Sequence, residues 1–247
     1  METFWKLPEN ISTFGAEIDR LFFVIVVIRG IVFVAVEATL VVFLVRYRHR
    51  EGHRAEYIHG SNKLEIAWTA ATALIVLVLG IVSWGLWVRI KNPAHFPAPG
   101  LSLEVMAKQF EWNVKYPGAD GQLGTDDDYT VRNQLHVPVD TPVRITLMSE
   151  DAIHSFYVPQ LRLKQDAVPG MQIPMWFEAT RAGEFVIGCA ELCGLGHYRM
   201  KGSLTVHTAA DFTTWQASRV AAAAGSAPEA GAPAVAAAVA TAAPHAH

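Results

Sequence analysis

Four side chains with metal-binding chemistry fall within the twelve residues 189–200 of this chain. The segment CAELCGLGHYRM contains both cysteines of the 247-residue sequence, Cys189 and Cys193, followed by His197 and Met200. Thiolate, imidazole and thioether groups all bind metals, and two thiols can instead form a disulfide. The pattern therefore allows a disulfide, a zinc site or a site for a softer metal.

Copper explains the whole set better than the two alternatives. A Cys189–Cys193 disulfide would close a very small loop, which limits the stabilisation it can give, and would leave His197 and Met200 without a role. Zinc binds cysteine and histidine readily but has little use for a thioether, whereas Met sulfur is a soft ligand suited to copper. Glycines between the four positions let the backbone turn the ligands inward.

Two long apolar stretches predict membrane-spanning helices. Residues 21–45 are interrupted only by Arg29 and Glu37, and residues 66–88 contain no charged side chain. About 20 apolar residues cross the hydrocarbon core of a bilayer as a helix. Tryptophans lie toward the ends of the second stretch, where aromatic belts occur. A membrane hairpin is therefore favoured over two buried helices of a soluble protein.

The distribution of basic residues orients this hairpin. Residues 46–65 carry five Lys or Arg, whereas residues 1–20 carry two. The positive-inside rule places the connecting loop in the cytoplasm and both termini outside. The first stretch lacks a basic region before it and a small-residue cleavage site after it, so we expect it to be retained.

The chain then divides into four parts. Residues 1–20 form an outward N-terminal segment, and residues 21–91 the hairpin. Residues 92–218 contain short apolar or alternating runs separated by turn-rich pieces, a pattern typical of a β-sandwich. Residues 219–247 are rich in alanine and proline with few large apolar side chains, which indicates a flexible tail.

A second imidazole is expected for copper in a β-sandwich, and His154 in SEDAIHSFYVPQLRLKQDAVPG is the strongest candidate. The other histidines outside the metal segment fall in the cytoplasmic loop, in unpatterned surroundings or in the tail: His49, His53, His59, His95, His136, His207, His245 and His247.

The charged residues indicate neither a nucleic-acid partner nor an EF-hand calcium site. The net charge of the whole chain is −3. Residues 92–247 carry ten basic and fifteen acidic side chains, which suits either a basic protein partner or simple solvation. Glu150, Asp151 and Asp166 lie near the copper motifs in sequence and, if they share one face, would attract a basic protein partner there. The Asp-rich stretch 118–128 lacks the spacing of an EF-hand, so a solvated acidic loop is favoured.

The motifs SEDAIHSFYVP, LKQDAVPG and CAELCGLGHYRM, together with the hairpin, resemble subunit II of the haem–copper cytochrome c oxidases over residues 15–215. The resemblance implies a membrane-anchored chain in which a two-helix transmembrane hairpin precedes an all-β, cupredoxin-like Greek-key sandwich. It also implies a dinuclear copper centre, CuA. Quinol-oxidising relatives lack the copper ligands, so both cysteines speak against that branch.

The resemblance implies a ligand set for the two coppers. Cys189 and Cys193 would bridge both metals. One copper would add His154 and a weak Met200 ligand, and the other would add the ligands His197 and the backbone carbonyl of Glu191. The side chain of Glu191 is expected to bind a magnesium or manganese ion shared with subunit I.

The implied activity is electron transfer within a terminal oxidase of the respiratory chain. The chain would accept electrons from cytochrome c or an equivalent donor and pass them to haem in subunit I, where oxygen is reduced. Its partners would be subunit I, other oxidase subunits and the lipid bilayer. The expected location is the inner (cell) membrane of a bacterium, with the C-terminal domain on the periplasmic face.

Further residues take expected roles from the same resemblance. Glu65 matches an acid near the entrance of a proton pathway, although an interfacial charge explains it equally well. Phe110 stands where the family usually has the tryptophan that receives electrons, and Trp112 is kept. Since charges within a membrane span are costly, at least one of Arg29 and Glu37 is expected to face subunit I.

Two other classes of protein remain as alternatives. A membrane-anchored copper chaperone would use a Cys-x3-Cys pair and a distant histidine, and would not need Met200 as a ligand. A tethered structural subunit would carry a vestigial site, against which the complete ligand set argues.

Overall fold

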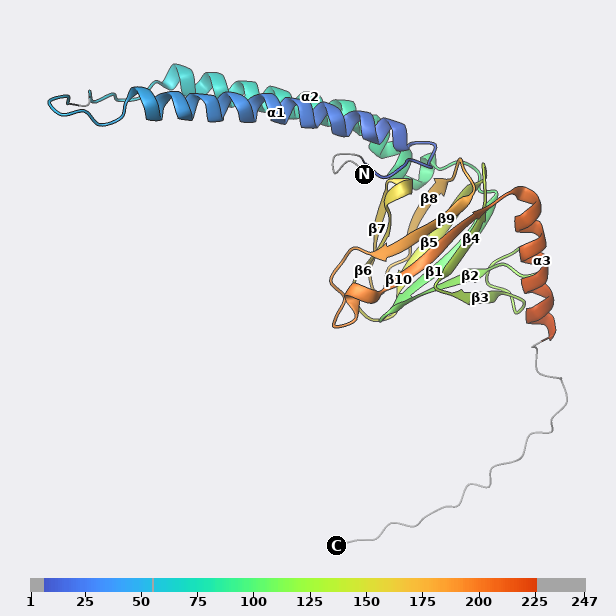
Figure 1. Cartoon of the computed structure of the whole chain (residues 1–247). Helices are drawn as coiled ribbons and strands as arrows, with labels where there is room; N and C mark the ends of the chain where they lie inside the picture. The colour runs from blue at the N-terminus through green and yellow to red at the C-terminus, as the bar shows by residue number, and fades with distance from the viewer. Residues whose placement is uncertain (1–6, 55, 226–247) are drawn as a thin grey trace, which may run out of the picture.

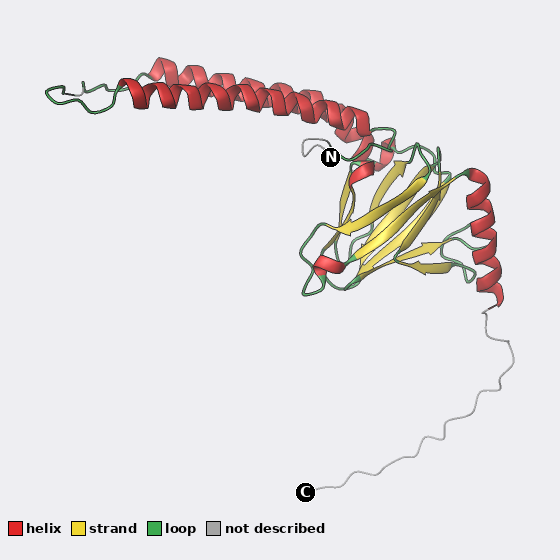
Figure 2. Ribbon diagram, viewed as in Figure 1, coloured by secondary structure: helices red, strands yellow, loops and turns green. Residues whose placement is uncertain are grey.

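The computed structural model describes residues 7–54 and 56–225 of the chain. Two long helices, α1 (Gly15–Arg46) and α2 (Asn62–Lys91), run side by side and lead away from a β-sandwich (Figure 1). The sandwich is flanked by a C-terminal helix, α3 (Ala209–Gly225) (Figure 2). The predicted order, a two-helix hairpin followed by an all-β domain, is confirmed.

The hairpin helices are apolar around their whole circumference. Both are long and apolar enough to cross a membrane, and their most apolar windows are not buried within this chain. An α-helix rises about 1.5 Å per residue, so the 30 residues of α2 extend about 45 Å, more than the hydrocarbon core requires. Arg29 and Glu37 are exposed on α1, and their contact with another subunit stays a prediction.

Two five-stranded sheets form the sandwich. The first contains β1 (Leu101–Lys108), β2 (Glu111–Tyr116), β3 (Tyr129–Arg132), β5 (Pro142–Ser149) and β8 (Ile173–Glu178), in the order β3-β2-β1-β5-β8. The second contains β4 (Gln134–Pro138), β6 (His154–Val158), β7 (Leu163–Ala167), β9 (Gly183–Cys189) and β10 (Lys201–His207), in the order β4-β10-β9-β6-β7. Three short 3₁₀ helices complete the described elements: η1 (Pro93–His95), η2 (Pro159–Leu161) and η3 (His197–Arg199).

Alternation of apolar side chains fixes which face of each strand enters the core. Every second residue of β1 and of β5 is buried, and these two strands pair in parallel. A strand with this period presents one apolar face, and packing two such faces together removes both from water. Large side chains with almost no exposure fill the space between the sheets: Trp112, Tyr116, Phe156 and Phe177.

The segment before α1 belongs to the sandwich. Ile11 and Phe14 are buried at 0% and 2% exposure, and Ser12 forms a β-bridge with Ala179 just beyond β8. The Ile11 N–H donates to the Gln160 carbonyl at 2.9 Å. The sequence separates residues 1–20 from the outward domain, whereas the structure packs Ile11 and Phe14 of that segment into the domain core.

Helix α3 extends beyond the predicted domain boundary at residue 218. Phe212 is 7% exposed, and the Trp215 ring stacks on the His136 ring at 4.3 Å between centroids. These anchors and the high helix propensity of alanine explain why residues 219–225 are helical rather than tail. The rest of the predicted tail, with His245 and His247, lies outside the described residues.

Carboxylates of the Asp-rich stretch 118–128 organise its own turns. Asp128 accepts a hydrogen bond from the Gly124 N–H at 2.7 Å, and Asp127 accepts one from the Thr125 hydroxyl at 2.7 Å. A Cβ at Gly118 would lie 2.2 Å from the Asp127 carboxylate carbon, so this approach requires glycine. Asp127 and Asp128 thus accept hydrogen bonds within the turns of their own stretch, as acids in turns commonly do.

Candidate metal centre

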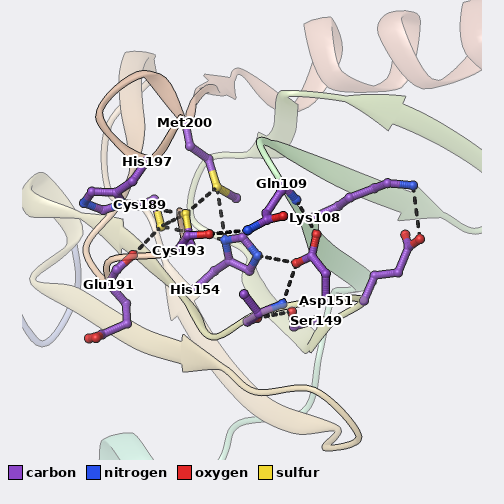
Figure 3. A network of polar contacts seen from close by, with 12 residues as sticks. Lys108, Gln109, Ser149, Asp151, His154, Cys189, Glu191, Cys193, His197 and Met200 are labelled. Atoms are coloured by element: carbon purple, nitrogen blue, oxygen red, sulfur yellow. Dashed lines mark hydrogen bonds and ion pairs between the residues drawn. The ribbon is translucent and has the colours of Figure 1, made fainter. Parts of the chain in front are cut away.

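Strand pairing brings the metal-binding segment to His154. His154 begins β6, and Cys189 ends β9, and these strands are joined by the pair Phe156↔Cys189. The loop after Cys189 returns through η3 to Met200, immediately before β10. The five side chains predicted to bind copper thereby converge with the Glu191 carbonyl, as Figure 3 shows.

The two thiols are separate groups. Their Sγ atoms lie 3.8 Å apart, and both cysteines are free. A disulfide bond is about 2.05 Å long, so these sulfurs are not bonded to each other. The separation leaves room for a metal to bind both sulfurs. With His154, the two cysteines have ligand atoms within 4.8 Å of one another, a spacing that suits a metal ion.

Cys189 contacts one donor from each of the two predicted copper sites. Its Sγ lies 3.9 Å from Nδ1 of His154. The same sulfur lies 3.2 Å from the backbone carbonyl oxygen of Glu191.

Cys193 does the same with the two remaining donors. Its Sγ lies 3.7 Å from Nδ1 of His197 and 3.8 Å from Sδ of Met200. Each thiol thus touches one donor assigned to each copper, as a pair of bridging ligands must. A single tetrahedral metal would not use six donors, so the arrangement fits two metals better than one.

Burial protects the centre of the site. His154, Cys193 and Met200 are exposed by no more than 3%. Burial, followed by the neighbouring Cys189 thiol, raises the pKa of Cys193 to about 11. Without metal this thiol is therefore neutral at pH 7, and metal binding must displace its proton. Two thiolates, two imidazoles and a thioether in a partly dry pocket fit copper, and the thioether fits zinc poorly.

Asp151 orients the His154 ring. Its Oδ1 lies 2.8 Å from Nε2 of His154, and its Oδ2 accepts from the Gln109 N–H at 2.8 Å (Figure 3). Burial raises the pKa of Asp151, but hydrogen bonds from His154 and two backbone N–H groups outweigh it and lower that pKa below its usual range. A carboxylate that accepts the Nε2 proton leaves Nδ1 free to face the sulfurs.

Sequence reasoning treats Asp151 as a surface charge for docking and misses this contact. The local signal is its spacing, since it stands three residues before His154 in the segment DAIH. The other two acids near the motifs are also engaged. Glu150 pairs with Lys108 at 3.1 Å, and Asp166 accepts from the Ser155 hydroxyl at 2.7 Å.

The backbone carbonyl and the side-chain carboxylate of Glu191 point in different directions. Its carbonyl faces Cys189, whereas its exposed side chain points away from the sulfur cluster (Figure 3). The carboxylate is therefore accessible to an ion or subunit beside the domain. Its binding of magnesium or manganese remains a prediction.

The two aromatic residues before the site differ in exposure. Trp112 is fully buried, with its ring 6.3 Å from that of His154. Phe110 is partly buried against residues 189–200, here called the metal loop. A Cβ at Gly196 in that loop would lie 2.4 Å from the Phe110 ring. The side-chain amide of Gln109 also donates to the Cys193 carbonyl. A docking partner can therefore reach Phe110 but not Trp112.

Glu65 is remote from this centre. It is exposed in the first turn of α2, at the end of the hairpin that lies away from the sandwich (Figure 1). The structure does not bring it together with any metal-site residue. Its role at a proton pathway stays a prediction.

Comparison with protein families matches both parts of the chain. Residues 4–86 match the family described as cytochrome c oxidase subunit II, transmembrane domain, and residues 116–206 match its periplasmic domain. The alternative cytochrome c oxidase subunit 2 of Bradyrhizobium diazoefficiens is 34% identical, covering 85% of this chain and 82% of that protein. Cytochrome c oxidase subunit 2 of Thermostichus vulcanus is 32% identical, covering 85% and 77%.

Solved structures include a similar domain. The periplasmic domain of subunit II of cytochrome oxidase from Bradyrhizobium japonicum is 28% identical, with a TM-score of 0.44. The match covers 49% of this chain and 94% of that domain.

Proposed function

The chain belongs to the cytochrome c oxidase subunit II family, and we propose that its outward domain holds a dinuclear copper centre that relays electrons from cytochrome c or an equivalent donor to haem in subunit I. The chain is part of a haem–copper oxidase and is anchored in the membrane with a periplasmic domain. We place the loop between α1 and α2 in the cytoplasm, because its basic residues exceed those of the N-terminal segment.

One observation carries the proposal for two coppers. The thiols lie 3.8 Å apart, and each contacts one donor from each of two donor sets. Cys189 and Cys193 would bridge the metals, His154 and Met200 would complete one site, and His197 with the Glu191 carbonyl would complete the other. When bound, such a pair accepts and releases single electrons with little change in geometry, because the electron is shared by both metals.

The surrounding residues prepare the site for this role. Burial of His154, Cys193 and Met200 keeps water from those ligands. Asp151 fixes the orientation of the His154 ring, and the Gln109 amide holds the Cys193 carbonyl. A site whose ligands are held before and after electron transfer needs little reorganisation.

Three further roles belong to the same proposal. The exposed Glu191 carboxylate would bind a magnesium or manganese ion at the contact with subunit I. Glu65 would lie near the entrance of a proton pathway on the cytoplasmic side. Phe110, which borders the metal loop, would be the aromatic group nearest a docked donor.

Electron paramagnetic resonance of the purified, copper-loaded full chain tests the metal content. We expect about two coppers per chain and a hyperfine pattern in which one unpaired electron couples to two copper nuclei. A signal from one copper nucleus at one copper per chain would reject the proposal and favour a copper-delivery protein. The Met200→Leu variant is the matched control: it removes the weakest ligand and should keep both coppers and their resonance signal.

A further inference from the structure

Arg162 joins the metal-bearing sheet to the first membrane helix. Its Nε donates to Oδ1 of Asp19 at 2.6 Å, and a terminal nitrogen donates to Oδ2 of the same carboxylate at 2.9 Å. That terminal nitrogen also donates to the Pro8 carbonyl at 2.6 Å, and the other donates to the Pro159 carbonyl at 2.7 Å. The Arg162 side chain is 10% exposed and that of Asp19 22%, so the contact between them is largely shielded from water.

The backbone of Arg162 occupies a conformation that normally favours glycine. Its φ is +54°, in the left-handed region, where a Cβ costs roughly 1 kcal/mol or more. A residue other than glycine keeps this conformation only where contacts with its surroundings hold it there. The bidentate contact with Asp19 is a specific reason to keep arginine, because lysine cannot form it.

A short and rigid stretch of chain connects Arg162 to the metal ligands. β6 begins with His154, continues into η2 and reaches Arg162 eight positions later in the sequence. The five residues of β6 extend about 17 Å, and two of them pair with the end of β9, in the pairs Phe156↔Cys189 and Tyr157↔Gly188. Any tilt of this strand at its Arg162 end therefore moves both His154 and Cys189.

The second membrane helix is tied to the same region. Lys91 Nζ donates to the Lys164 carbonyl at 3.0 Å and to Oε1 of Gln165 at 2.8 Å, both in β7. The helices are linked to each other by an ion pair of Glu17 with Arg89 at 2.6 Å. Both helices thus form hydrogen bonds with the segment that runs from η2 into β7.

We propose that Arg162 is a positioning residue that fixes the metal loop in place relative to the membrane helices, by anchoring η2 and β6 to Asp19 and Pro8. This inference rests on the proposed electron-transfer function. Electron transfer falls steeply with distance, so a loop that moves relative to the helices would transfer electrons more slowly to a membrane-embedded acceptor. The contact of Arg162 acts through geometry, since the side chain lies at the opposite end of β6 from the copper ligands.

The test measures electron transfer in the assembled, detergent-purified oxidase complex. The variants are Arg162→Gly, Arg162→Lys and Asp19→Asn, with Arg181→Gln as the control. Arg162→Gly removes the side chain and relieves the backbone cost, so its effect cannot come from backbone strain. Arg181 pairs with Glu9 in the same N-terminal segment, but both side chains are more than half exposed.

We expect Arg162→Gly to slow copper-to-haem electron transfer by about tenfold per assembled complex. Arg162→Lys and Asp19→Asn should slow it less, and Arg181→Gln should not change it. The copper resonance signal and the rate of reduction by cytochrome c should match those of the native complex in every variant. A native copper-to-haem rate in Arg162→Gly and Asp19→Asn complexes would overturn the inference and leave Arg162 a purely structural residue.

The same measurements separate this inference from the proposed function. Absence of a two-copper signal in the native complex would reject the function itself. Presence of that signal with unchanged transfer in the variants rejects only the positioning role. If Arg162→Gly complexes do not assemble, Asp19→Asn decides the question, because it keeps the arginine and alters only its partner.

Discussion

Oδ1 of Asp151 lies 2.8 Å from Nε2 of His154, the ring whose Nδ1 faces the sulfur donors. The carboxylate that sequence reasoning places on a docking surface is therefore attached to a predicted copper ligand. Its partner Oδ2 is held by the Gln109 N–H at 2.8 Å, so the carboxylate cannot turn away without losing a second contact. A variant that neutralises Glu150 and Asp151 together would thus confuse docking with ligand orientation.

Asp151→Asn should weaken copper binding. An amide can donate to Nε2 and favour the wrong tautomer of His154, and loss of a carboxylate behind a metal-binding imidazole typically costs about 10–100-fold in metal affinity. Copper retained by the full chain during competition with a chelator measures this. Glu150→Gln is the matched control, since it removes the same charge one residue away without touching His154. Equal retention in both variants would rule out the orienting role.

Glu150→Gln should instead affect a basic donor. Removing one acid from the negatively charged outward domain is expected to lower the association rate with cytochrome c by about two- to threefold and to flatten its salt dependence. The effect should appear between about 0.01 and 0.1 M salt, where the screening length falls from roughly 30 to 10 Å. Stopped-flow reduction measures it, with an unchanged copper spectrum.

Glu104→Gln is the matched control for that experiment. Each of these acids forms an ion pair with a lysine: Glu104 with Lys115 at 3.3 Å, and Glu150 with Lys108. Glu104 lies in the interior of β1, whereas Glu150 follows the end of β5. Equal slowing in the two variants would indicate a general charge effect and no local docking face. A native rate that does not respond to salt would indicate docking through apolar contact near Phe110.

Replacing either thiol should have a larger effect than replacing the thioether. Cys189→Ser or Cys193→Ser removes a group that contacts donors of both predicted coppers, so the two-copper resonance signal should vanish. Met200→Leu should keep both coppers and shift the reduction potential, because leucine has a similar volume and the thioether is the weakest ligand. Loss of both coppers from a folded Met200→Leu chain would contradict this ranking.

Glu191→Gln should leave copper in place but disturb the neighbouring ion. The copper would use the Glu191 carbonyl, which this substitution retains, whereas the exposed side chain loses its charge. Manganese bound by the assembled complex, counted after growth in manganese, is the measurement. Glu184→Gln is the control, because Glu184 is an exposed acid near the opposite end of β9. Native manganese content in the Glu191 variant would remove this residue from the ion site.

The features that can be predicted from the sequence are those that depend on residues close together along the chain. The hairpin follows from composition, and four of the side-chain ligands lie within residues 189–200. The spacing of Asp151 from His154 allows their contact, but the second contact that holds this carboxylate, with the Gln109 N–H, depends on the fold and on no local pattern. Trp112 is buried because β2 turns that side inward, and its part in electron entry stays a prediction.

Long-range packing also explains the differences in domain boundaries. Ile11 appears to belong to a segment outside the domain, but its environment is provided by Gln160 and Thr180, far along the chain. Likewise, Trp215 converts an alanine-rich stretch into a docked helix by stacking on His136. Pairings of this kind depend on the three-dimensional fold and cannot be read from neighbouring residues.

The same stacked histidine predicts that the domain loses stability as the pH falls. Nδ1 of His136 lies 2.8 Å from Nε2 of His207, and a shared proton between the rings requires at least one neutral ring. Burial, then the charges of His207 and Arg219, lower the pKa of His136 from 6.5 to about 4. Burial also lowers the pKa of His207, although Asp211 opposes this. The Tyr116 hydroxyl exchanges hydrogen bonds with the His136 backbone, and burial raises its pKa above the usual range.

The sign of the effect follows from these directions. Above about pH 6.5 both the folded and unfolded forms hold His136 neutral, so its full contribution to stability is present. As pH falls from 6.5 toward 4 the unfolded chain takes up the proton first, and the folded domain loses about 1 kcal/mol by pH 5. Thermal unfolding at pH 7 and pH 5, compared between the native chain and His136→Gln, should show a smaller loss in the variant. His95→Gln, which changes an exposed histidine in the connector, should behave as the native chain does. An equal loss of stability in the native and His136→Gln chains would show that another group controls the acid response.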